Sequence, residues 1–79
     1  MASIFKTDIK AIKTQMVKKD IGTITELAEK TGISRNTISG VLNGKIQPSA
    51  EIMGKLIFTL DIKPEVAGAI FFSTDLREP

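Results

Sequence analysis

The sequence predicts an all-α fold, in which residues 1–79 form one compact domain of five helices. Three observations predict it. Apolar residues recur at three- and four-residue spacing in several stretches, which is the periodicity of amphipathic helices. Ser, Thr and Pro stand at positions where helices begin. Two short helical patterns meet at Gly32, and a chain this short is a single domain that oligomerisation often stabilises further.

Composition excludes several classes of function. The chain has no Cys and no His, so disulfides, thiol catalysis and imidazole-based metal or acid–base sites are excluded. It also lacks a phosphate-cradling glycine loop and an evident carboxylate pair, so we expect no enzyme, no cofactor, no metal and no small-molecule substrate. No apolar run reaches the length of a membrane span, and the first residues lack the layout of a signal peptide. We therefore expect a cytosolic protein with no membrane association.

Charge is distributed unevenly along the chain. Residues 1–48 hold eight Lys and Arg against four Asp and Glu (8 − 4 = +4), whereas residues 49–79 hold three against five (3 − 5 = −2). This asymmetry favours a first half that faces phosphate and a second half that faces protein or water. An ordinary solvated surface is the alternative, because neither half is strongly charged.

The first helix is predicted from about Ser3 to Lys19. Its core stripe has the helical spacing i, i+4, i+7 and i+11 and consists of Phe5, Ile9, Ile12 and Met16. Lysines line another flank and the C-terminal end, where positive charge complements the helix dipole. These lysines can serve solubility or reach a phosphate backbone, and both interpretations stay open.

The second helix is predicted from about Ile24 to Thr31. Thr23 stands three residues before Glu26, which is the spacing of a capping box. Gly32 follows the helix and can adopt the left-handed conformation that ends it.

The third helix is predicted from about Ser34, its cap, to Asn43. Helical spacing turns Ile38, Val41 and Leu42 toward the core. Gly40 is unexpected there, because glycine in a helix interior costs about 1 kcal/mol relative to alanine. It either permits close approach to a groove or partner or is simply tolerated.

Two further helices follow. The fourth begins after its cap, Ser49, and its inward face consists of Met53, Leu56, Ile57 and Leu60, with Ile52 at the edge. Pro64 can occupy the first turn of a fifth helix that reaches about Phe72. The tail, residues 73–79, is polar and is expected to be loose.

The C-terminal part of the chain has more large apolar residues than a small core needs. Phe58 points away from the inward stripe of the fourth helix, as judged from about 100° per residue. Aromatic residues outside a core stripe are typical of protein interfaces. We therefore expect a protein interface formed by Phe58, Ile70, Phe71 and Phe72. The alternative is that the fifth helix folds back and covers them.

The central stretch, residues 23–45, resembles the helix-turn-helix of the phage Cro/repressor, or XRE-type, family. The resemblance rests on the order of small and apolar positions and on the sequence that ends the third helix: Leu27, Ala28, Gly32, Ile33, Ile38, Val41 and Asn43-Gly44-Lys45. It implies a lambda-repressor-like domain that binds a double-stranded DNA operator in the bacterial host cytoplasm, associated with the nucleoid. It also implies a small Cro-like regulator of a phage genetic switch, acting as a homodimer or in a complex with a phage repressor. In such a dimer the recognition helices stand about 34 Å apart.

The same resemblance implies the site residues. Base-reading positions fall on Arg35, Asn36 and Ser39, of which Arg35 can pair with guanine and Asn36 with adenine. Positions that contact phosphate fall on Thr23, Thr25, Ser34, Thr37, Asn43, Lys45 and Gln47. Ile24 departs from the pattern, because many members of the family have a phosphate-binding glutamine there.

Two other interpretations stay open. The first is an ordinary helical hairpin without a DNA role. The second is an antirepressor or modulator that keeps the helix-turn-helix fold but docks against a phage repressor. Ile24, Gly40, the modest net charge and the surplus of aromatic residues all favour this second interpretation.

Overall fold

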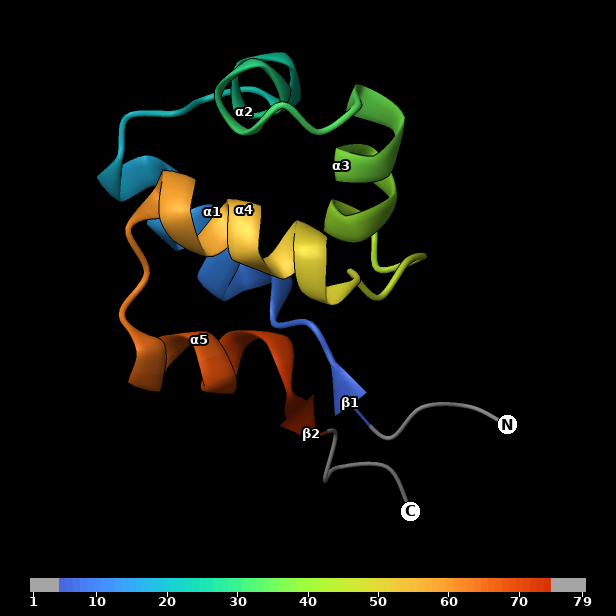
Figure 1. Ribbon diagram of the computed structural model, residues 1–79, viewed down its shortest axis with the longest axis vertical. Coiled ribbons are helices and arrows are strands. Elements are labelled where there is room, and N and C mark those ends of the chain that lie inside the picture. Colours follow the sequence, from blue (N-terminus) through green and yellow to red (C-terminus); the bar gives the residue numbers. More distant parts are fainter. Residues whose placement is uncertain (1–4, 75–79) are drawn as a thin grey trace.

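Five helices and one short antiparallel strand pair make up the fold. The structure is a computed structural model that describes residues 5–74 (Figure 1). The all-α class is confirmed, with strands of only two residues each. The elements in chain order are β1 (Phe5–Lys6), α1 (Ile9–Lys18), α2 (Ile24–Thr31), α3 (Arg35–Leu42), α4 (Ala50–Leu60), α5 (Pro64–Phe71) and β2 (Ser73–Thr74).

The helices are arranged around α4. In Figure 1, α2 and α3 lie on one side of α4 and α5 lies on the other, while β1 and β2 bring the two ends of the described chain together. α2 packs against both α3 and α4, and α1 packs against α5. The helix-turn-helix therefore stands on the side of the domain opposite α5 and the strand pair.

The core is apolar throughout the described part of the chain, where no polar or charged residue is buried. The predicted stripe of α1 is confirmed for Ile12 and Met16, and Ile9 packs partly buried against the core. In α4, Leu56 and Leu60 are buried, as their spacing predicts. The complete set is Ile12, Met16, Ile21, Leu27, Ala28, Ile33, Ile38, Val41, Leu42, Leu56, Leu60, Ile62, Ala67, Ile70 and Phe71.

The start of the first helix differs from the prediction. α1 begins at Ile9, because the Asp8 side chain caps it by accepting a hydrogen bond from the Ala11 N–H at 3.1 Å. Ahead of this cap the backbone is extended, and Phe5 pairs with Thr74 in the strand ladder. Phe5 therefore does not belong to the stripe of α1, and the predicted start at Ser3 is wrong, although Ser3 itself lies outside the described residues.

The predicted tail differs in the same region. Ser73 and Thr74, expected to be loose, form β2, and residues 75–79 lie outside the described residues. Next to the strand pair, between the residue that follows β1 by two positions and the end of α5, the Asp8 N–H donates to the Ile70 carbonyl at 2.6 Å. The first and last described segments therefore stabilise each other through contacts that local sequence does not reveal.

The other helices follow their local signals closely. Thr23, Ser34 and Ser49 are the N-caps of α2, α3 and α4, and each side chain accepts a backbone hydrogen bond three residues ahead. Gly32 adopts the left-handed conformation with φ of 76° at the end of α2, as predicted. The boundaries predicted for these helices and for the start of α5 at Pro64 are confirmed.

Candidate nucleic-acid interface

The two helices of the central motif are held by hydrogen bonds at their junctions. Thr23 Oγ1 accepts from the Glu26 N–H at 3.0 Å, and Glu26 Oε1 accepts in return from the Gly22 N–H at 3.1 Å. In the turn, Thr31 Oγ1 donates to the Leu27 carbonyl and accepts from the Ile33 N–H at 3.2 Å. The start of α2 and the turn after it are therefore both satisfied by hydrogen bonds within the motif itself.

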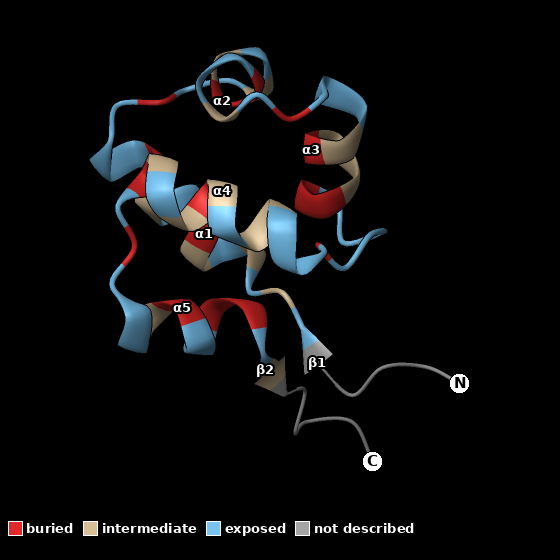
Figure 2. Cartoon of the chain, viewed as in Figure 1, coloured by how far each residue is buried: buried red, intermediate tan, exposed pale blue. Residues whose placement is uncertain are grey.

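α3 has one buried face and one exposed face, as the sequence predicts. Ile38, Val41 and Leu42 are buried against the rest of the domain (Figure 2). The opposite side carries residues predicted to contact DNA: Arg35, Asn36 and Asn43 are exposed, whereas Ser39 is half-buried.

The polar side chains of α3 fall into two groups. Ser34 Oγ accepts from the Thr37 N–H at 3.2 Å and donates to Thr37 Oγ1 at 2.9 Å. Asn43 Nδ2 donates to Ser39 Oγ at 3.2 Å. In contrast, Arg35 and Asn36 make no side-chain hydrogen bond or ion pair with any residue in the range 5–74. Their donors and acceptors are therefore available to a ligand.

The loop after α3 folds back against the helix. Gly44 has φ of 75°, which only glycine adopts without steric cost. The Lys45 N–H donates to the Gly40 carbonyl at 2.9 Å and the Gly44 N–H to the Val41 carbonyl at 3.1 Å. These are the two bonds of a Schellman motif. They hold Lys45, which is exposed, close to the C-terminal end of α3.

Gln47, predicted to contact phosphate, makes two hydrogen bonds within the domain. Its Oε1 accepts from Thr7 Oγ1 at 3.0 Å, and its Nε2 donates to the Phe71 carbonyl at 2.9 Å. Because both ends of the amide bond to other parts of the domain, Gln47 joins the loop to the start of the chain and to α5. These bonds favour a scaffold role for Gln47, and its contact with phosphate stays a prediction.

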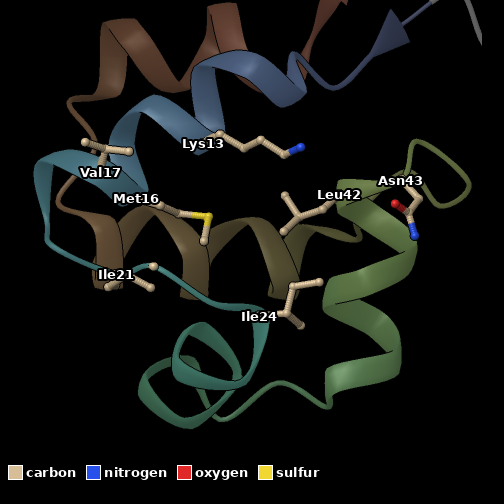
Figure 3. A pocket seen from close by; sticks show the side chains of 8 residues that line it. Lys13, Met16, Val17, Ile21, Ile24, Leu42 and Asn43 are labelled. Atoms are coloured by element: carbon tan, nitrogen blue, oxygen red, sulfur yellow. The ribbon is translucent and has the colours of Figure 1, made fainter.

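An open apolar pocket lies between α1 and the helix-turn-helix (Figure 3). Its volume is about 370 Å³. Val17, which is 76% exposed, Ile24 and Leu42 are among its apolar lining residues, and Lys13 reaches across it from α1. Asn43, a predicted phosphate contact, also lines it. The sequence suggested Ile24 as a departure from the family pattern but gave no sign that Val17 extends the same apolar surface.

The predicted protein interface is only partly at the surface. Phe58 is 88% exposed and Phe72 is 52% exposed. Ile70 and Phe71, by contrast, are buried in the core at 2% and 1% exposure. Their assignment to a partner surface is therefore corrected, because α5 packs back against α1 and both side chains are part of the core of the same chain. A further exposed apolar residue, Ile46, was not identified from the sequence and lies in the loop after α3.

We also searched the described residues for metal sites and for membrane-spanning helices. Within residues 5–74, no three His, Cys, Asp or Glu side chains gather closely enough to bind a metal ion. None of the helices in that range has both the length and the apolar character needed to cross a bilayer.

Comparison with known proteins gives one match. A family model described as helix-turn-helix matches residues 13–66, from the middle of α1 into α5. No curated protein and no solved structure was found to be significantly similar to the chain.

Proposed function

The chain belongs to the helix-turn-helix family of DNA-binding transcription regulators, and we propose that it binds an operator sequence-specifically, as a Cro-like member of a phage genetic switch. One observation carries the proposal: the first turn of α3 presents Arg35 and Asn36 to solvent without partners in the described chain. They stand on the exposed face of a helix whose other face is anchored in the core. A helix in this setting can enter a major groove with its N-terminal residues toward the base edges.

The base contacts follow from the chemistry of the side chains. The Arg35 guanidinium can donate two parallel hydrogen bonds to guanine O6 and N7. The Asn36 amide can pair in the same bidentate way with adenine N6 and N7. Ser39 already accepts from Asn43, but its hydroxyl hydrogen is free to donate to a base.

The phosphate contacts come from the ends of the two helices and from the loop. Helix N-termini bind anions through unpaired backbone N–H groups. Thr23 and Ser34 use their hydroxyl oxygens as caps, and Thr25 is exposed in the first turn of α2. Together with the side chains of Thr37, Asn43 and Lys45, these groups are the ones that we assign to the DNA backbone.

We propose a homodimer as the DNA-binding form, because two recognition helices about 34 Å apart meet successive major grooves. The exposed rings of Phe58 and Phe72 are the apolar side chains of α4 and of the α5 terminus that a second copy can cover. Large exposed aromatic residues are frequent anchors of protein interfaces.

The test begins with selection of preferred duplexes from a random pool, followed by titrations at two salt concentrations. Arg35→Ala is expected to cost about 1–3 kcal/mol on the preferred duplex and to relax its sequence preference. Lys45→Ala is expected to weaken binding to all duplexes equally and to lower the salt slope by about one. Lys63→Ala is the matched control, since Lys63 is exposed at the cap of α5, away from the helix-turn-helix. Equal losses for Arg35→Ala on preferred and random duplexes would remove Arg35 as a base reader.

The pocket favours a second candidate function. Val17 and Ile24 place apolar surface beside the start of α2, where a DNA-binding member would present polar groups to phosphate. Such a surface suits a protein partner, and a phage repressor is the partner proposed for an antirepressor or modulator. Titration of promoter DNA with the neighbouring repressor, in the presence and absence of this protein, separates the two functions. If this protein binds no DNA alone but changes the repressor's DNA binding, and Val17→Asp abolishes that effect, the antirepressor function is supported.

A further inference from the structure

Position 40 lies on the exposed face of the recognition helix. At about 100° per residue, positions 36, 40 and 43 fall within about 60° of one another around the axis of α3. The core residues Ile38, Val41 and Leu42 lie on the opposite side. A side chain at position 40 would therefore stand between Asn36 and Asn43, which are both proposed to contact DNA. Because residue 40 is glycine, α3 itself supplies no side chain at this place.

Ile46 occupies the space that the glycine leaves. A Cβ atom built on Gly40 would come within 2.8 Å of Ile46 Cγ1, and it would come closer still to Ile46 Cδ1. The Ile46 side chain thus lies where a side chain of residue 40 would begin. It is nevertheless 44% exposed, so it covers the helix without being enclosed by it.

The backbone holds Ile46 in this place. The Ile46 N–H donates to the Gly40 carbonyl at 3.2 Å, and the Lys45 N–H donates to the same oxygen at 2.9 Å. On the other side of Ile46, the side chain of Gln47 is bonded to Thr7 and to the Phe71 carbonyl. The loop is therefore anchored at Lys45 and Ile46 to α3 and at Gln47 to Thr7 and the Phe71 carbonyl, which holds Ile46 beside Gly40.

We propose that Ile46 is a specificity-determining residue that contacts the 5-methyl group of thymine in the major groove; this inference rests on the proposed operator binding. An isoleucine side chain has no hydrogen-bond donor or acceptor, so it can discriminate bases only through apolar contact. Thymine is the base that presents a methyl group in the major groove. The loop thus places an apolar side chain over Gly40, between the base proposed to be contacted by Asn36 and the phosphate proposed to be contacted by Asn43. Gly40 is the positioning residue, because any larger residue there displaces Ile46.

Replacement of thymine by uracil tests this contact, since it removes only the methyl group. The preferred duplex is synthesised with uracil at one thymine position at a time, and the Kd of each duplex is measured. At one or two positions wild-type protein is expected to lose about fourfold in affinity, the change that corresponds to one methyl-sized group. Ile46→Ala is expected to bind the thymine and uracil duplexes equally at those positions. Gly40→Ala, which keeps isoleucine but moves it, is expected to reduce the same difference.

Lys63→Ala is the control, because Lys63 is exposed at the cap of α5, away from the helix-turn-helix, and should leave the thymine–uracil difference unchanged. The comparison on wild-type protein gives a result even if Ile46→Ala does not fold. If wild-type protein shows sequence preference but no thymine–uracil difference, the assignment of Ile46 is wrong while operator binding stands. The assignment is also wrong if Ile46→Ala keeps the wild-type difference, since Ile46 would then only pack on Gly40. Absence of any sequence preference would overturn both proposals.

Discussion

Replacement of Gln47 distinguishes a scaffold residue from a phosphate contact. Gln47→Ala removes the hydrogen bond from Nε2 to the Phe71 carbonyl, which is 2.9 Å long and partly buried, and the exposed bond from Thr7 Oγ1, which is 3.0 Å long. A partly buried hydrogen bond contributes about 1 kcal/mol, and leaving the Phe71 carbonyl unsatisfied adds to the loss. We therefore expect the free energy of unfolding to fall by about 1–2 kcal/mol. For a domain of this size that corresponds to a decrease in Tm of about 4–16 °C.

Thermal unfolding by circular dichroism measures this loss. DNA titrations measure the affinity, and their salt dependence gives the number of phosphates that Lys and Arg neutralise. Gln47→Ala is expected to lower Tm without changing the DNA affinity measured well below Tm. Lys45→Ala should leave Tm unchanged, because Lys45 is exposed. It should weaken DNA binding and lower the salt slope by about 0.9, the contribution of one phosphate neutralised by a lysine. Gln47→Glu is the isosteric control: it keeps the volume but replaces the donor that faces the Phe71 carbonyl, so it should destabilise at least as much as alanine.

The opposite pattern would refute the reasoning. If Gln47→Ala melts within about 1 °C of wild-type protein and weakens binding to preferred and random duplexes equally, then Gln47 contacts phosphate and its internal hydrogen bonds contribute little.

Two further predictions concern stability. Phe71→Ala is expected to lower the free energy of unfolding by about 3–5 kcal/mol, because Phe71 is only 1% exposed. Phe58→Ala should change the stability of the monomer by no more than about 0.5 kcal/mol, because Phe58 is 88% exposed. Urea denaturation measures both, and similar losses for the two variants would contradict the difference in burial. Asp20→Gly is expected to stabilise the domain by about 0.5–1 kcal/mol, because Asp20 has φ of 58° at the end of α1, a conformation in which glycine has no Cβ penalty. Removal of a negative charge from a helix C-terminus acts in the same direction. An unchanged or lower urea midpoint for Asp20→Gly would mean that this backbone position is not strained.

Much of the helical framework follows from short-range signals. The caps Thr23, Ser34 and Ser49 each bond to a backbone N–H three residues ahead, so the sequence near each helix contains the information that starts it. The turn at Gly32 and the exposed positions of Arg35 and Asn36 follow for the same reason, since helical periodicity relates each position to its neighbours. The missed start of α1 shows the limit of periodicity. Phe5 has the spacing of the stripe, but the Asp8 cap and the pairing with Thr74 determine its structure.

The sequence by itself therefore determined the five helices, the helix-turn-helix and the exposed face of α3, because each depends on residues within about one or two turns of one another. Only the tertiary structure decided which surplus apolar residues are core. Phe71 and Phe58 are alike in sequence, but α5 folds back so that Phe71 is enclosed and Phe58 is not. The same holds for Gln47, whose partners lie 24 and 40 residues away along the chain. The position of the Ile46 side chain next to Gly40 could not be predicted from the sequence either, because it depends on how the loop packs against α3.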